Sequence, residues 1–223
     1  MIKNIRAYNV DKLIRDRKFV EERFKYEDGG HGHKISLPSI DGISESHKNW
    51  YENEPYREVL GYTPYFKEIF DSFETEIAGF MLQERKPYSS YGLHEDRGLG
   101  KKVKRFQIPI ITNGDVWLCI TDHHVIPEDI RLLYEKDGLN DGSNLWTHEV
   151  FEDKNKQAFR NFKERFDGHY KCYKLPPGIM YHFDVTNIHT LFNGGSTSKV
   201  SLLIDLKVND WLENWIENEF LPF

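Results

Sequence analysis

The chain has 223 residues, of which 39% are hydrophobic, 14% aromatic and 30% charged, a composition typical of one globular domain and not of a disordered chain. The formal net charge of -6 argues against a partner held through nucleic-acid phosphates. Two cysteines, Cys119 and Cys172, allow one disulfide but neither a disulfide framework nor a thiolate zinc site. No apolar run reaches membrane-spanning length. We therefore expect a soluble, cytoplasmic single domain over residues 1–223, with no nucleic-acid and no membrane partner.

Residues 1–75 are predicted to be mostly helical. Apolar residues recur at helical spacing over 9–27, so one face of this segment can pack while its basic residues face water. Glycine, serine and proline interrupt any periodicity over 28–46, which predicts a long loop. Thr63 is expected to cap the helix that follows, over 63–76, where a proline occupies the first helical position.

From about residue 76 the hydrophobic period changes to that of β-strands. Seven short strands after a helical start predict a mainly β (α+β) domain, a sandwich or small barrel with helices packed outside it. This core spans 76–208, is interrupted by an insertion over 122–170, and is followed at 209–223 by a helix capped by Asn209 or Asp210. The apolar or alternating runs lie at 77–87, 105–113, 115–122, 170–175, 178–185, 189–193 and 199–208.

The stretch "HED" places His94 and Asp96 two residues apart. On a strand these two side chains point to the same face, where they could bind one metal ion while Glu95 points away. A non-haem Fe(II) centre requires a second histidine to complete its two-histidine, one-carboxylate set. The alternative is that His94 and Asp96 are two surface charges at the start of a loop.

Further downstream, His189 lies in a run that leads through an Asn-Gly-Gly turn into a strand carrying Lys199. In an antiparallel hairpin both side chains could face one cavity, where the lysine could receive the far carboxylate of a metal-bound dicarboxylate. The alternative is a solvated strand lysine. Arg105 and Gln107 share a strand face that is either exposed to solvent or turned into a barrel that binds an anion.

Other histidines offer competing sites. His182 and Asp184 form a second His-x-Asp pair, with His189 as a third ligand seven residues after the first. His31 and His33 lie in the glycine-rich segment and are interpreted as surface residues.

The motif order is similar to that of a known family. "HED" at 94–96, "RFQIPI" at 105–110, "PPGIMYHFDVTNIHTLFN" at 176–193 and "KVSLLIDL" at 199–206 resemble the aspartyl/asparaginyl β-hydroxylase branch of the 2-oxoglutarate/Fe(II)-dependent oxygenases. The resemblance covers about residues 62–208.

This resemblance implies a double-stranded β-helix, the jelly-roll fold also found in cupins. It implies that Fe(II) is bound by His94, Asp96 and His189. Together with the metal it implies 2-oxoglutarate as co-substrate and O₂ as oxidant.

Four further residues are implied as co-substrate contacts. Lys199, ten positions after the distal histidine, matches the basic residue that binds the far carboxylate, although the family usually has arginine there. Arg105 matches an arginine near the other end of the co-substrate, and Gln107 stands where a histidine is common. Gln83 matches a polar contact of the co-substrate.

The implied reaction is hydroxylation of an unactivated C–H bond in an amino-acid side chain, with release of succinate and CO₂. The substrate would be an Asp, Asn or Pro residue of a polypeptide, or a free amino acid. Because the carboxylate ligand Asp96 is present, no ligand position is vacated for chloride, and hydroxylation is favoured over halogenation. The alternatives are a cupin-like metal enzyme that does not use 2-oxoglutarate and a non-catalytic jelly-roll binding module.

Overall fold

The structure is a computed structural model. It describes residues 2–24, 26–29, 32–36, 59–87, 89–90, 94, 96, 102–121 and 171–219. The predicted insertion at 122–170 and the final part of the predicted loop, from residue 37 onward, lie outside the described residues.

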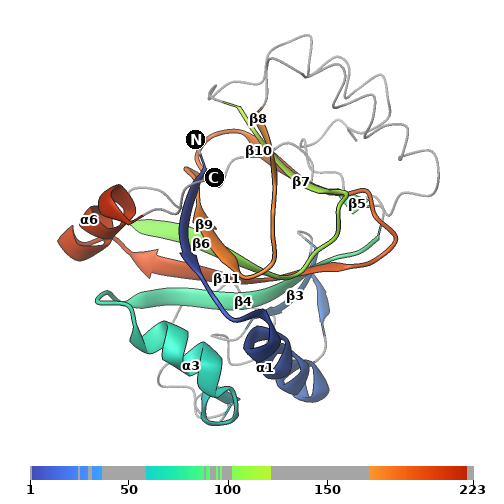
Figure 1. Ribbon diagram of the computed structural model, residues 1–223, viewed down its shortest axis with the longest axis horizontal. Helices are drawn as coiled ribbons and strands as arrows, with labels where there is room; N and C mark the ends of the chain where they lie inside the picture. Colours follow the sequence, from blue (N-terminus) through green and yellow to red (C-terminus); the bar gives the residue numbers. More distant parts are fainter. Residues whose placement is uncertain are drawn as a thin grey trace.

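A seven-stranded antiparallel sheet forms the larger layer of the fold (Figure 1). In spatial order its strands are β1 (Lys3–Ala7), β9 (Ile179–His182), β6 (Val103–Ile111), β11 (Lys199–Lys207), β4 (Ile77–Arg85), β3 (Gly32–Ser36) and β2 (Glu27–Gly29). Strand β11 pairs along its length with both β6 and β4, so it is buried at the centre of the sheet.

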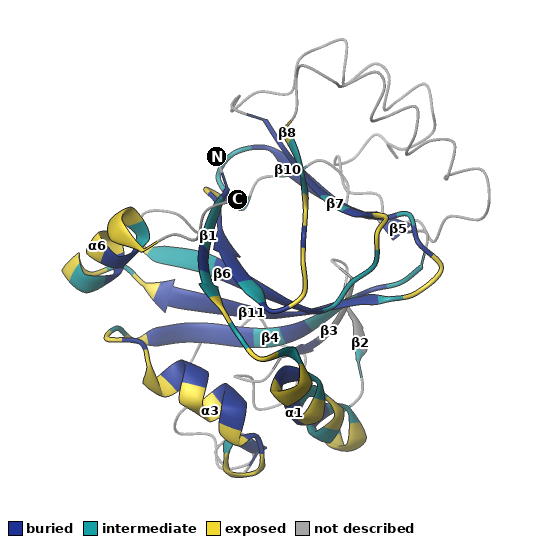
Figure 2. Cartoon of the chain, viewed as in Figure 1, coloured by how far each residue is buried: buried dark blue, intermediate teal, exposed yellow. Residues whose placement is uncertain are grey.

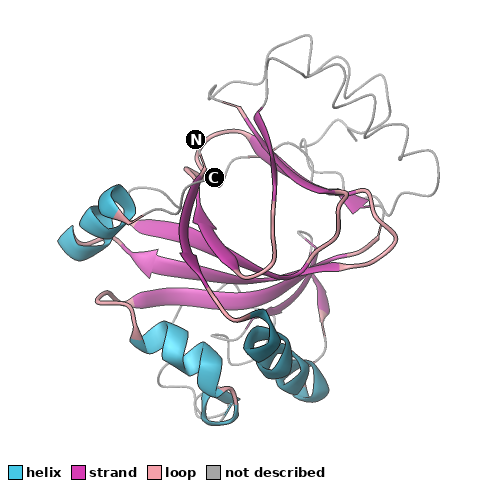
Figure 3. Cartoon of the chain, viewed as in Figure 1, coloured by secondary structure: helices cyan, strands magenta, loops and turns pink. Residues whose placement is uncertain are grey.

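A four-stranded antiparallel sheet faces the larger one (Figure 3). Its strands are, in order, β5 (Ser89–Ser90), β10 (His189–Asn193), β7 (Val116–Ile120) and β8 (Lys171–Lys174). Each of the seven predicted apolar runs coincides with one of the strands β4 and β6 to β11. Because most consecutive strands from β4 onward alternate between two facing antiparallel sheets, the predicted jelly-roll core is confirmed.

Helices cover the outer face of the larger sheet (Figures 1 and 2). They are α1 (Val10–Arg23), α3 (Pro64–Asp71) and α6 (Asp210–Asn218). Side chains alternate along a strand, so every second residue of β6 and β11 points to these helices. The resulting core includes Phe106, Ile108, Leu202 and Ile204 from the strands and Leu13, Phe66 and Trp215 from the helices.

The opposite face of the larger sheet looks toward the smaller sheet. Tyr181 of β9 packs in a second apolar cluster with Leu118 of β7 and Leu191 of β10, which places these side chains between the two layers. Tyr181 pairs with Gln107 of β6, which pairs with Leu203 of β11, so these residues share the inner face. Because side chains alternate along a strand, Arg105 and Lys199 lie on the same face.

The prediction of a loop from residue 28 is wrong for its first part, since β2 and β3 lie there and join the larger sheet. Strand β3 pairs with β4, and Ile35 is buried against the helix-covered core. Strand β1, in the part predicted to be mostly helical, pairs with β9. These short strands form because long-range hydrogen bonds to an existing sheet edge are available, and local composition does not report such bonds.

Thr63 is the N-cap residue of α3, as predicted, but its side chain does not cap the helix. Thr63 makes no capping bond through its side chain, and its Oγ1 donates to the carbonyl oxygen of Val59. Instead Asp16, buried on α1, accepts hydrogen bonds from the backbone N–H groups of Tyr65 at 2.7 Å and Phe66 at 3.0 Å. A carboxylate at this position satisfies two N-terminal donors and complements the helix dipole.

At the other end of the chain the cap of α6 is as predicted, because Asn209 Oδ1 accepts from the backbone N–H of Leu212. Cys119 and Cys172 lie opposite each other on β7 and β8 and form a disulfide, which realises the one pairing that the sequence allowed. Among the described residues no helix is long and apolar enough to span a membrane.

Candidate metal centre

Two histidines from distant parts of the chain lie directly opposite each other. His94 and His189 form an isolated antiparallel bridge, with each backbone N–H donating to the other's carbonyl oxygen at 3.0 and 2.9 Å. Their imidazole rings are 4.2 Å apart between centroids. The bridge fixes both backbones, so both rings project from the same place at the start of β10.

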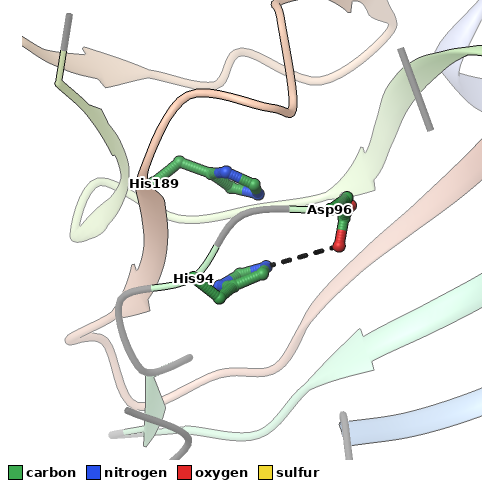
Figure 4. Close-up of side chains that lie close together, drawn as sticks. All are labelled: His94, Asp96 and His189. Atoms are coloured by element: carbon green, nitrogen blue, oxygen red, sulfur yellow. Dashed lines mark ion pairs between the residues drawn. The ribbon is translucent and has the colours of Figure 1, made fainter. Parts of the chain in front are cut away.

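Asp96 completes a cluster with these histidines (Figure 4). Its backbone N–H donates to the carbonyl oxygen of Val185 at 2.8 Å, and its Oδ1 lies 4.0 Å from Nε2 of His94. One ligand atom from each of His94, Asp96 and His189 lies within 4.8 Å of the other two. Among the residues that the structure describes, these form the cluster able to hold a metal ion.

The state of His189 suits a metal ligand. Its Nδ1–H donates to the carbonyl oxygen of Asn187 at 2.9 Å, so Nε2 carries the lone pair on the side of the ring that can bind a metal. Burial lowers the pKa of the His189 imidazole to about 4, with the charge of Arg105 acting in the same direction. The ring is therefore neutral at physiological pH, as a metal ligand must be.

Two imidazole nitrogens and one carboxylate oxygen match the donor set of non-haem Fe(II) centres, which leave further coordination positions open. His94 and His189 are largely buried and Asp96 is partly exposed, so the cluster lies at an accessible edge of the interior. The donor atoms present therefore fit such a metal.

The rival pair does not form a site of its own. His182 lies on the face of β9 that packs against Phe106, with ring centroids 5.0 Å apart, and its Nδ1–H donates to the carbonyl oxygen of Arg105 at 2.9 Å. Asp184 accepts hydrogen bonds from the backbone and hydroxyl of Thr186 in a turn. The choice of His94 and Asp96 over this rival pair is therefore supported, because His182 packs against Phe106 and Asp184 holds a turn.

Arg105 bridges two carboxylates on the inner face of the larger sheet. Its Nε and Nη2 donate to the two oxygens of Asp205, on the neighbouring strand β11, at 2.8 and 2.9 Å. Its Nη1 donates to Oδ2 of Asp96 at 2.9 Å. The resemblance implied a contact with the co-substrate, whereas in this structure the guanidinium contacts a residue of the metal cluster. Asp205 was not predicted as a site residue, although its spacing of six from Lys199 places both on one strand face.

Lys199 lies at the other end of β11 from Asp205. The predicted hairpin of His189 and Lys199 is wrong, because β10 and β11 belong to different sheets and the intervening turn crosses between them. Lys199 nevertheless points inward and is fully buried. Within the described part of the chain its Nζ has no hydrogen-bond partner.

A second cation lies beside Lys199. Arg85, also buried, lies directly opposite Lys199 on the paired strand β4. Burial first, and then the charge of Arg85, holds the pKa of the Lys199 ammonium well below its ordinary value. Two buried cations side by side disfavour each other, so an anion is the ligand that would suit this end of the interior. Arg85 was not predicted, although it lies two residues after Gln83 on the same strand face.

The two glutamines that were implied as co-substrate contacts lie on the same inner face. Gln107 is buried, and its Oε1 accepts a hydrogen bond from the hydroxyl of Tyr181. Gln83 is half-buried and lies opposite Ser201 of β11. The face shared by Arg105 and Gln107 is therefore turned into the fold and is not a solvent face.

Solved structures share this fold. HygX from Streptomyces hygroscopicus, with nickel and 2-oxoglutarate bound, superimposes with a TM-score of 0.53 at 10% identity, over 94% of this chain and 83% of HygX. The same protein with iron bound gives a TM-score of 0.50 at 10% identity, over 94% of this chain and 82% of HygX.

AviO1 from Streptomyces viridochromogenes Tue57 is 15% identical over 94% of this chain and 90% of its own, with a TM-score of 0.49. No protein-family model matches the sequence, and no curated protein matches it either. At these identities the likeness to HygX establishes the fold, and the chemistry rests on the residues described above.

Proposed function

We propose that this protein is an Fe(II)- and 2-oxoglutarate-dependent oxygenase. The observation that carries the proposal is the pairing of a His94, Asp96 and His189 cluster with a buried ammonium at Lys199 that has no counter-ion within the described residues. The first group suits a metal, and the second suits the far end of an anionic ligand. The fold shared with HygX, which has been solved with 2-oxoglutarate and with iron bound, supports this combination.

In this proposal each residue has a defined task. His94, Asp96 and His189 hold Fe(II) through two nitrogens and one oxygen. The bound iron and 2-oxoglutarate supply the chemistry that activates O₂ and oxidises a C–H bond, with succinate and CO₂ as the other products. Lys199 binds the far carboxylate of 2-oxoglutarate, and the charge of Arg85 adds to the attraction because both cations are buried.

The remaining inner-face residues shape the co-substrate site. The bond from Tyr181 fixes the orientation of the Gln107 amide, so its NH₂ group is available as a donor toward the interior. Gln83 lies on the same face, two residues before Arg85 on β4. Both amides can hydrogen-bond an anion without adding a charge.

The reaction that we propose is hydroxylation of an amino-acid side chain, in a polypeptide or a free amino acid, as in the aspartyl/asparaginyl β-hydroxylase branch. The retained carboxylate ligand Asp96 supports hydroxylation over halogenation. The net charge of -6 supports the proposal that no nucleic acid takes part. A cytoplasmic enzyme without a membrane partner completes the proposal.

The test is an anaerobic titration of the metal-free protein with Fe(II) and 2-oxoglutarate, monitored for the weak visible metal-to-ligand charge-transfer band. We expect a band that requires both components and is lost in Asp96→Ala and in Lys199→Met. Lys207→Met, at the exposed end of the same strand, is the matched control and should keep the band.

The outcomes separate the candidate functions. Metal binding without the band would refute the use of 2-oxoglutarate and favour a cupin-like metal enzyme. Failure to bind any metal would favour a non-catalytic binding module.

A further inference from the structure

Asp205 is a buried carboxylate that is linked to the metal cluster through Arg105, yet it does not belong to that cluster. Its side chain is 1% exposed, and both of its oxygens accept hydrogen bonds from Arg105. Arg105 and Asp205 are also directly opposite each other on β6 and β11, the central pair of strands. The guanidinium is therefore anchored by two parallel bonds, which leave Nη1 to reach Asp96.

We infer that Asp205 is a positioning residue for the metal centre, acting through Arg105 to orient the Asp96 carboxylate. This inference rests on the proposed function, because it assigns these residues to the metal site proposed above. The inference goes beyond the proposed function because it assigns Arg105 and Asp205 to orienting the metal ligand Asp96 and not to binding the co-substrate.

The two oxygens of the Asp96 carboxylate have different partners. Oδ2 of Asp96 accepts the hydrogen bond from Arg105, while Oδ1 is the oxygen that lies near Nε2 of His94. With one oxygen held, rotation of the carboxylate is restricted, and the other oxygen lies on the side of the histidines. The backbones of His94 and His189 form a two-bond bridge, whereas the backbone of Asp96 is bonded to Val185, so the bond from Arg105 adds a restraint on the Asp96 side chain itself.

Asp205 also sets the net charge beside the metal cluster. Arg105 alone would place a positive charge 2.9 Å from a metal ligand and would repel a divalent cation. Asp205 balances that charge, so Asp96, Arg105 and Asp205 together present one net negative charge to the metal. Removing only the charge of Asp205 leaves this group neutral, and the attraction for a cation falls.

The experiment measures binding of Co(II) alone to the metal-free protein by calorimetry and by the visible bands of bound Co(II). Asp205→Asn removes the balancing charge, and we expect an affinity about 10- to 100-fold weaker, the effect typical of changes to residues that orient metal ligands. A double variant, Arg105→Met with Asp205→Leu, removes the bridge but keeps one net negative charge at Asp96. It also leaves no unpaired buried charge, so its fold should be retained.

We expect the double variant to bind Co(II) about 10-fold more weakly than wild type and to show altered Co(II) bands, because the carboxylate is no longer held. Asp16→Asn is the matched control, since Asp16 is equally buried but caps α3. Its Co(II) affinity should equal that of wild type even if its stability falls.

The outcomes distinguish this inference from the proposed function. Wild-type affinity and bands in a folded double variant would overturn the positioning role while leaving the metal site intact. Weaker 2-oxoglutarate binding with unchanged Co(II) binding would also overturn it, because Arg105 would then act on the co-substrate. Failure of the wild-type protein to bind Co(II) would refute both the inference and the proposed metal site.

Discussion

Replacing Lys199 by methionine is expected to stabilise the ligand-free protein and to abolish binding of 2-oxoglutarate. The ammonium is fully buried, has no hydrogen-bond partner within the described residues, and faces a second buried cation at Arg85. A cation in this environment is costly to the folded state, and the proposed anionic co-substrate would offset that cost. Methionine has similar length and no charge, so it removes the cost without leaving a large cavity.

The size of the effect follows from the burial. Leaving a buried polar group unsatisfied costs about 1–3 kcal/mol, and more for a charged group. In a protein of this size each kcal/mol corresponds to roughly 2–4 °C in Tm. A gain of about 2 kcal/mol would therefore raise the Tm of the ligand-free variant by roughly 4–8 °C.

The pH dependence gives the sign of the effect independently. The pKa of Lys199 is lowered in the folded state, so between that pKa and the ordinary value of 10.5 the unfolded chain binds a proton that the folded protein does not. Stability of the wild type therefore rises with pH through this interval. The advantage of Lys199→Met should be largest below the folded-state pKa and should disappear as the pH approaches 10.5.

The assay is urea unfolding at several pH values, combined with the Fe(II) and 2-oxoglutarate titration. Lys207→Met serves as the control, since this lysine is exposed and its loss should change the free energy of unfolding by no more than about 0.5 kcal/mol. A Lys199→Met variant less stable than wild type by about 1 kcal/mol or more would refute the reasoning, because the ammonium would then have a stabilising partner in the ligand-free protein.

Three further predictions concern stability. Burial lowers the pKa of His182 to about 4, so as the pH falls from 6.5 to about 4 the unfolded chain takes up a proton that the folded protein does not, and stability is lost. His182→Leu should reduce this acid-dependent loss by about 3 kcal/mol. An unchanged pH profile in urea unfolding would contradict this prediction. Asp16→Ala should cost about 2 kcal/mol through loss of the α3 cap, measured by urea unfolding, and a loss below about 0.5 kcal/mol would contradict the capping role. The Cys119–Cys172 disulfide joins residues separated by 53 positions, so replacing both cysteines by alanine should lower the free energy of unfolding by about 4 kcal/mol in the chain-entropy model. Equal Tm values for wild type and variant would show that this bond does not constrain the unfolded chain.

The sequence by itself determined the positions of the main strands and helices. Alternating apolar residues mark β6 and β11, and the helical spacing of Leu13 and Val20 marks α1, because these periods follow from local backbone geometry alone. The spacing of His94 and Asp96, with His189 downstream, also indicated three side chains that the structure brings together. Their binding of a metal stays a prediction until it is measured.

The tertiary structure alone decided which strands pair and what each buried charge contacts. Pairing with β4 turned part of a predicted loop into β3, and the crossing between sheets separated β10 from β11. Arg105 meets Asp205 across a separation of 100 residues, and Lys199 meets Arg85 only because β11 lies beside β4. Local periodicity fixes which face a side chain takes, whereas its partner depends on the register of strands far apart in the chain, and that register is set when the whole core is buried.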